Sequence, residues 1–134
     1  MLNENAKVWV AALRSGDYTQ TKQMLHRVTQ DKASFCCLGV ACELYRDSVG
    51  GEWVAVGNPE WNEQAKFMDD EGGLSDSDLT LAVMDWLGLV NSEGTFYDAE
   101  GVRFTLVGLN DQANRTFAQI ADVIESKPKG LFNA

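Results

Sequence analysis

The stretch that decides the fold is Cys36-Cys37-Leu38-Gly39-Val40-Ala41-Cys42-Glu43-Leu44-Tyr45-Arg46. Its apolar side chains recur at the spacing of one helical face, and a second series covers another face. A helix that is apolar on nearly every side is a buried one. The small residues at positions 39 and 41 let other segments approach its backbone closely. The sequence therefore predicts a central buried helix around which the other elements pack.

Shorter patterns on either side of this helix predict three further helices. Each has apolar residues at helical spacing together with a start or stop signal. The first ends before a glycine suited to a left-handed cap, the second begins with four capping residues, and the third begins with a capping box. The predicted helices cover residues 5–15, the segment from Ser75 to Gly88, and the segment from Thr116 to Pro128. Thr116 and Gln119 form the capping box of the last of these.

Strands are predicted where apolar residues alternate or cluster between turn residues. Two isolated strands and one hairpin with a glycine-containing turn fit this description. An acidic, glycine-rich segment reads as an irregular loop or insertion. The expected strands are 23–29, 52–56 and the hairpin of 95–97 with 102–107; the expected turn is 30–32, and the expected loops are 57–73 and 108–115.

These elements together predict the fold class and the domain organisation. About four helices would pack on a small antiparallel sheet, which is an α+β architecture. A chain of 134 residues is long enough for one hydrophobic core, so we expect a single globular domain over residues 1–134.

The composition limits the partners and the compartment. The formal net charge is −9, which argues against direct coating of DNA or RNA, because such surfaces need a basic excess. A local phosphate pocket or a basic partner protein remains compatible with this charge. No apolar run approaches the length of a membrane span, and the N-terminus lacks signal-peptide features. We therefore expect a cytoplasmic protein with no membrane partner.

Several blocks of the sequence carry a family resemblance. They are Trp9-Val10-Ala11-Ala12-Leu13-Arg14-Ser15-Gly16-Asp17-Tyr18, Cys36-Cys37-Leu38-Gly39-Val40-Ala41-Cys42, Trp86-Leu87-Gly88-Leu89 and Leu109-Asn110-Asp111, with Phe117 and Ile120-Ala121. The chain resembles a widespread family of small proteins encoded by tailed bacteriophages. The resemblance implies a phage origin, and hence the cytoplasm of an infected bacterial host, but it assigns no catalytic residues. Small phage accessory proteins often counter bacterial immunity, either by sequestering nucleotide-derived signals or by blocking a host protein.

The cysteines are the candidate reactive groups. Cys36 or Cys37 at a helix N-terminus could act as a nucleophile, with His26, the single histidine, as its base. Against this, free cysteines on an apolar helix usually pack as small hydrophobic residues. A zinc site that includes Cys42 is disfavoured, because adjacent cysteines do not match the spacing of common zinc sites. We therefore expect no catalytic residue, no metal and no cofactor.

Two groups of polar residues are candidate ligand contacts. One group surrounds the connector after the first helix, where a tyrosine could stack on a base and arginines could bind phosphates. The other group follows the predicted hairpin and could bind a ribose. The alternative interpretation is that these residues cap a helix, shape a turn or face solvent. The candidate residues are Arg14, Tyr18, Gln20, Arg27, Asn110 and Asp111.

The leading hypothesis from the sequence is a non-enzymatic phage protein that counters host immunity by binding and sequestering a small nucleotide-derived signal. A small domain rarely encloses a polar ligand alone, so we expect a homo-oligomer. Two alternatives remain open. The protein could be an acidic inhibitor of a host defence or replication protein, or it could be a cysteine-dependent hydrolase.

Overall fold

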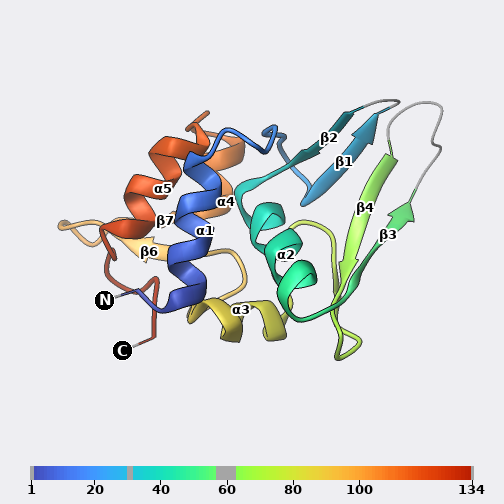
Figure 1. Cartoon of the computed structure of the whole chain (residues 1–134). Helices are drawn as coiled ribbons and strands as arrows, with labels where there is room; N and C mark the ends of the chain where they lie inside the picture. Colours follow the sequence, from blue (N-terminus) through green and yellow to red (C-terminus); the bar gives the residue numbers. More distant parts are fainter. Residues whose placement is uncertain (1, 30–31, 57–62, 134) are drawn as a thin grey trace.

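The computed structural model describes residues 2–29, 32–56 and 63–133. These residues form an α+β fold in one domain, as the sequence predicts (Figure 1). The described helices are α1 (Glu4–Arg14), α2 (Cys37–Ser48), α3 (Leu81–Leu87), α4 (Leu106–Asp111) and α5 (Phe117–Glu125). The described strands are β1 (His26–Thr29), β2 (Lys32–Phe35), β3 (Glu52–Val56), β4 (Glu63–Met68), β5 (Leu74–Ser75), β6 (Thr95–Tyr97) and β7 (Arg103–Thr105).

Helix α2 is the centre of the fold, which confirms the prediction for residues 36–46. It lies between the sheet and the other helices (Figure 1), and most of its residues are buried. Trp9 of α1 donates its indole N–H to the carbonyl of Cys37 at 2.9 Å. Gly39 makes the close approach on the other side, because a Cβ there would lie 1.8 Å from the carbonyl oxygen of Leu25. The small residue at position 39 is therefore required by packing.

The larger sheet is antiparallel, with strand order β2-β1-β4-β3 and the short β5 beside β4. One of its faces packs on α2 through aromatic rings. The His26 ring stacks on Phe35 with centroids 4.3 Å apart, and Trp53 meets Phe67 edge to face at 5.1 Å. Tyr45 of α2 packs on Phe67 at 6.2 Å. The smaller sheet is the hairpin β6–β7, which confirms the predicted hairpin. Its second strand ends at Thr105 rather than at residue 107, because Leu106 begins α4.

Three predictions in the sheet region were wrong. The strand expected over 23–29 begins only at His26. Lys32 was assigned to a turn but begins β2, whereas residues 30–31 lie outside the described residues. Residues 57–73 were assigned to a loop or insertion, yet Glu63–Met68 forms β4, which pairs with both β1 and β3. Its two buried positions, Ala65 and Phe67, alternate with more exposed ones. Pairing with the preceding strand β3 and with the distant strand β1 stabilises the segment. Residues 57–62 lie outside the described residues.

Two helix predictions also need correction. The helix expected from Ser75 to Gly88 is α3, and it begins at Leu81. The Thr80 side chain caps it, while Ser75 pairs with Phe67 of β4. Residues 108–115 were assigned to a loop, but α4 covers Leu106–Asp111, capped by the Thr105 hydroxyl, which accepts the N–H of Gly108 at 2.9 Å. The described chain therefore has five helices, where about four were expected.

Other local signals are confirmed. Gly88 ends α3 with φ 80°, in the left-handed region that favours glycine. Thr116 and Gln119 form the predicted capping box of α5. Among the described residues, the longest helices fall short of the length and apolar character that crossing a membrane requires.

Candidate functional site

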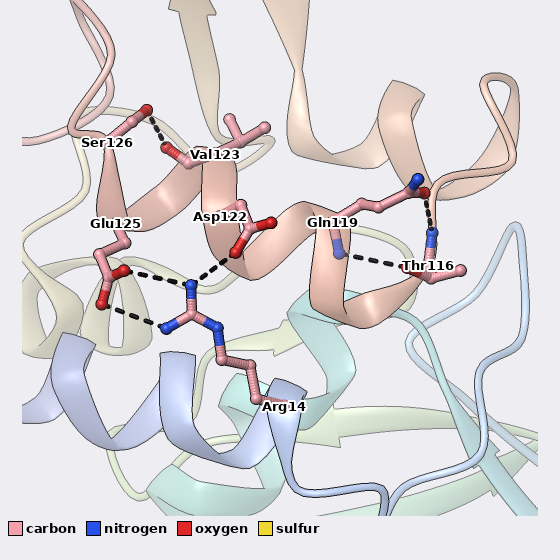
Figure 2. A network of polar contacts seen from close by, with 7 residues as sticks. All are labelled: Arg14, Thr116, Gln119, Asp122, Val123, Glu125 and Ser126. Atoms are coloured by element: carbon pink, nitrogen blue, oxygen red, sulfur yellow. Dashed lines mark hydrogen bonds and ion pairs between the residues drawn. The ribbon is translucent and has the colours of Figure 1, made fainter.

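Arg14, the first predicted ligand contact, is bound to carboxylates of α5. Its Nη2 lies 2.6 Å from Asp122 Oδ1, and its two terminal nitrogens lie 3.1 and 3.2 Å from the Glu125 carboxylate oxygens (Figure 2). The hydrogen bonds to Glu125 and then to Asp122 raise the pKa of the guanidinium above its ordinary value. Arg14 therefore fastens the end of α1 to α5 and has its charge balanced within the chain.

Asn110 is fully buried and lies at the meeting point of three segments. Its Oδ1 accepts hydrogen bonds from Gln20 Nε2 at 2.8 Å and from the N–H of Cys37 at 3.3 Å. Its Nδ2 donates to the carbonyl of Thr21 at 2.8 Å. Asn110 thus joins α4 to the first connector and to the start of α2. The structure therefore brings two predicted site residues, Gln20 and Asn110, into direct contact.

Asp111 extends the same network. Its Oδ1 accepts hydrogen bonds from Asn110 Nδ2 at 2.9 Å and from the N–H of Gln23 at 3.0 Å. Gln23 has a positive φ of 69°, and this hydrogen bond helps to hold that turn. We call Gln20, Asn110 and Asp111 the polar junction. Its hydrogen bonds are directed to the chain itself, so its clearest role is to fix the connector against α2 and α4.

Tyr18 and Arg27 do not join the polar junction in any hydrogen bond of the described residues. The Tyr18 ring packs edge to face on Phe35 with centroids 5.7 Å apart. Arg27 lies on β1, where its Nε contacts the sulfur of Met24 at 3.4 Å. The four candidate residues in and around the first connector therefore have different partners. Arg14 binds α5, Gln20 belongs to the polar junction, and the other two pack at the sheet. The four do not line one common pocket.

The three cysteines are buried thiols. Burial raises the pKa of Cys36 to about 12, even though its sulfur accepts the N–H of Gly39 at 3.3 Å. Burial also raises the pKa of Cys37 and Cys42 well above the ordinary value. A thiolate is the reactive form, so the environment of all three cysteines disfavours nucleophilic chemistry.

His26 is held away from a role as base. Its Nδ1 lies 3.0 Å from the carbonyl oxygen of Ser34, and its ring stacks on Phe35 and contacts the tilted ring of Trp53. Burial lowers the pKa of the imidazole below its ordinary value. In the part of the chain that the structure describes, no group of three or more His, Cys, Asp or Glu residues is arranged to hold a metal ion.

A groove that the sequence did not predict runs beside α4 and α5. It consists of two adjoining hollows of about 420 and 220 Å³, which share Phe104, Leu109 and Arg115. Arg103 lines the larger hollow, and Gln119 lines the smaller one. We call the surface lined by Arg103, Phe104, Leu109, Arg115 and Gln119 the α4–α5 groove.

The α4–α5 groove combines an apolar floor with two cations. Phe104 is 38% exposed and stacks on the buried Phe96, with ring centroids 5.6 Å apart. Arg103 lies 3.9 Å from Glu93, a long ion pair between exposed side chains. Arg115 forms no ion pair with the residues that the structure describes.

The backbone of Arg115 is held at both ends. Its N–H donates to the carbonyl of Leu109 at 3.0 Å, and its carbonyl accepts from Gln20 Nε2 at 2.8 Å. The polar junction is therefore connected to the α4–α5 groove through Gln20, which bonds Asn110 and Arg115 with the same amide group. Directly after Arg115, the capping box of Thr116 and Gln119 fixes the start of α5 (Figure 2).

A larger hollow, of about 760 Å³, lies at the turn of the β6–β7 hairpin. Its charged side chains are Asp98, Glu100 and Lys129, so carboxylates outnumber the single cation. A third hollow, of about 420 Å³, lies between the chain ends beside Lys127 and Lys129. The hollow at the hairpin has one cation, and the hollow between the chain ends pairs its two lysines with the half-buried ring of Phe132. The α4–α5 groove combines two arginines with the exposed ring of Phe104, so we take it as the best candidate for an anionic ligand.

The sequence contained only weak signals for this groove. Arg103 and Phe104 are adjacent in the predicted hairpin, and Arg115 directly precedes the predicted capping box. Because residues 108–115 were expected to form a loop, the sequence did not show that these residues lie close together. Once α4 forms, Arg103, Leu109 and Arg115 line one hollow.

The fold and the groove describe an α+β protein with a small, arginine-lined surface groove. Residues 1–128 match the family described as Domain of unknown function (DUF8296), and the chain belongs to that family. No curated protein and no solved structure gives a significant match to the chain.

Proposed function

We propose that this protein is a non-enzymatic phage accessory protein that counters host immunity by sequestering a small nucleotide-derived signal in the α4–α5 groove. One observation carries the proposal. Two arginines line the same groove as an exposed phenylalanine, on a chain whose formal net charge is −9. The phage setting is supported by the resemblance of the blocks around Trp9, Cys36 and Asn110 to small tailed-phage proteins.

The chemistry of the α4–α5 groove fits the two parts of a nucleotide. Guanidinium groups bind phosphate oxygens with two parallel hydrogen bonds, and aromatic rings stack on bases. Arg115 is the stronger phosphate candidate, because Arg103 already lies within 3.9 Å of a carboxylate. Phe104 offers the exposed ring, and Leu109 the apolar floor. A ligand that is wholly anionic would leave this apolar surface unused, so a phosphate joined to a base is the better fit.

Binding without cleavage is the part of the proposal that separates it from a hydrolase. The hydroxyl nearest the groove, Thr105, accepts the N–H of Gly108 and serves as a helix cap. The thiols of Cys36 and Cys37 are buried and carry a raised pKa. The groove thus offers groups that hold an anion and a base, and no activated nucleophile among its lining residues.

In this proposal the polar junction positions the site. Gln20 holds the backbone carbonyl of Arg115, and Asn110 holds the Gln20 amide. Asp111 holds the connector through the N–H of Gln23. The direct ligand contacts are assigned to Arg103, Phe104 and Arg115 rather than to Arg14, Tyr18 and Arg27.

The test is a thermal-shift screen of the purified protein against linear nucleotides, cyclic nucleotides and ADP-ribose derivatives, followed by calorimetry on any hit. A ligand at one hundred times its dissociation constant stabilises the fold by about 2.7 kcal/mol, which is a readily measured shift. Arg115→Ala should weaken a true groove ligand at least about tenfold, in keeping with the loss of a charge-assisted hydrogen bond. Heating the complex and analysing the released ligand by mass spectrometry should recover it unchanged.

The matched control is Arg46→Ala. It removes the same charge from α2, where Arg46 pairs with Glu43 and does not line the groove. Equal weakening by both variants would show a general charge effect and contradict the assignment to the groove. Recovery of cleaved products alone would favour the hydrolase. The absence of any shift, together with a stable complex in a pull-down from host extract, would favour the acidic inhibitor of a host protein.

A further inference from the structure

The two edges of the larger sheet differ in whether other segments bind their outer backbone groups. At the β2 edge, the N–H of Phe35 donates to the carbonyl of Thr19 at 2.8 Å, and the N–H of Thr21 donates to the carbonyl of Phe35 at 2.7 Å. The first connector therefore covers part of that edge. At the opposite edge lies β3, on the outer side of the molecule (Figure 1). Among the described residues, its backbone pairs only with β4.

The sequence of β3 lacks the features that usually protect an exposed edge. It reads Glu52-Trp53-Val54-Ala55-Val56 and contains no lysine, arginine or proline. Val54 is 37% exposed, and Ala55 is exposed as well. Natural proteins block edge strands with charges, prolines, bulges or covering segments, because free backbone groups accept another strand. The β3 edge is therefore a template for strand addition.

We propose that the strand added at this edge is β3 of a second copy of the chain, in antiparallel orientation. A twofold axis perpendicular to the sheet would relate the copies and keep the faces of the two sheets aligned. The result is a continuous sheet with order β2-β1-β4-β3-β3-β4-β1-β2. Both α2 helices would lie on one side of this sheet.

The charge pattern of the strand suits this self-pairing. The only charge on β3 is Glu52, at its first position, so antiparallel pairing separates the two Glu52 carboxylates to opposite ends of the ladder. Glu52 and Val54 lie on the same face of the sheet, and Val54 is opposite Lys66 of β4. Each Glu52 would therefore lie on the same face as the Lys66 ammonium of the other copy. Lys66 forms no ion pair with the described residues.

This dimer goes beyond the proposed function and is independent of it. The edge belongs to the sheet packed on α2, whereas α4, α5 and β7, whose residues line the groove, lie on the opposite side of α2 (Figure 1). A ladder of five residues is short, so we expect a reversible dimer with a dissociation constant of roughly micromolar order. Pairing with a second copy places the single charge of β3, Glu52, at the ends of the ladder and on the face that carries Lys66 of β4.

The experiment measures mass against concentration by sedimentation equilibrium, from about 1 to 500 µM, a range chosen to bracket that affinity. We expect the mass to rise from 14.8 kDa to twice that value. Val54→Lys puts a charge in the centre of the ladder and should weaken association at least about tenfold. The matched control is Val8→Lys, an exposed valine on α1 with the same change in charge, which should leave association unchanged.

A second measurement does not depend on a variant. Hydrogen exchange of the amides of residues 52–56 should slow as the wild-type concentration rises, because dimerisation pairs the outward-facing groups. A chain that stays at 14.8 kDa throughout the range would overturn the proposal. The proposal would also be overturned if the two variants, Val54→Lys and Val8→Lys, formed equally stable dimers and hydrogen exchange in β3 did not change with concentration. Neither result bears on ligand binding in the groove, so the two proposals can fail separately.

Discussion

The molecule has two regions that are built on different kinds of interaction. The helical region contains α1, α3, α4, α5 and the β6–β7 hairpin, and the sheet region contains α2 with β1–β5 (Figure 1). Every helix of the helical region starts at a side-chain oxygen cap, provided by Asn3, Thr80, Thr105 or Thr116. In the sheet region, α2 is capped by a cysteine sulfur, and β4 depends on pairing with β1 and β3.

This difference separates local from long-range information. A cap involves residues three positions apart, so it can be seen in the sequence. A strand such as β4 lies between two partners, and one of them, β1, is more than 30 residues away, so its own sequence says little about it. Each region also carries one of the two proposals. The proposed ligand groove is in the helical region, and the proposed dimer edge is in the sheet region.

The strongest way to break the sheet region is Gly39→Ala. The new Cβ would lie 1.8 Å from the carbonyl oxygen of Leu25, a backbone atom that cannot move without separating α2 from β1. We expect a loss of at least about 3 kcal/mol in the free energy of unfolding, at the upper end for overpacking. Urea denaturation followed by circular dichroism measures it.

The comparison variant is Gly108→Ala in α4. Its Cβ would meet only the Thr105 hydroxyl, at 3.0 Å, and alanine is a better helix former than glycine. We expect a much smaller change in stability. Similar losses for the two variants would mean that helix propensity, rather than the close approach of α2 to Leu25, decides the role of Gly39.

The next effect concerns the contact between the regions. Asn110→Leu keeps a similar side-chain volume but leaves the N–H of Cys37 and the carbonyl of Thr21 without their partner. Buried groups without partners cost about 1–3 kcal/mol, so we expect a loss of about 2–3 kcal/mol in unfolding free energy. The exposed neighbour variant Gln112→Leu should be nearly neutral. A neutral Asn110→Leu would show that the polar junction does not couple the two regions.

The sequence predicted the helical region better than the sheet region, for physical reasons. The α2 stretch, the Thr116 capping box and Gly88 were read correctly because their signals are local. Helix α4 was missed because six residues with a glycine in the middle have weak intrinsic propensity. Strand β4 was missed because polar residues hide its alternation, and because its pairing with β1 is long-range.

The candidate site was predicted only in part. The sequence singled out Gln20 and Asn110, but it could not show that each is the hydrogen-bond partner of the other. It placed Arg14 at a ligand, whereas the structure shows it bound to Asp122 and Glu125, 108 and 111 positions along the chain. The α4–α5 groove exists only after α4 has folded between Arg103 and Arg115, so no local pattern could indicate it.

A pH titration tests the aromatic packing of the sheet region. Burial lowers the pKa of His26 in the folded chain, so between that pKa and the ordinary value of 6.5 the unfolded state binds more protons. The free energy of unfolding should therefore fall as the pH drops through 6.5, and this loss should stop below the folded pKa. Urea titrations at pH 8, 7, 6 and 5 measure the change.

The control for this titration is His26→Phe, which keeps an aromatic ring against Phe35 and Trp53 and removes the titrating group. The difference in stability between wild type and variant should depend on pH within this window. A constant difference from pH 8 to pH 5 would contradict a lowered pKa at His26.

The smallest expected effect is in the helical region, at the ion pairs that join α1 to α5. Arg14 joins α1 to α5 through Asp122 and Glu125, but its side chain is 37% exposed and both carboxylates are more exposed still. Exposed ion pairs add little to stability, because water already solvates the charges. We expect Arg14→Ala to change the melting temperature by no more than about 1 °C, in low salt and in 1 M salt alike. A large loss that disappears in 1 M salt would mean that charge, rather than the packing of Trp9, Val10 and Ile120, holds these two helices together, and the contrast between the two regions would then need to be redrawn.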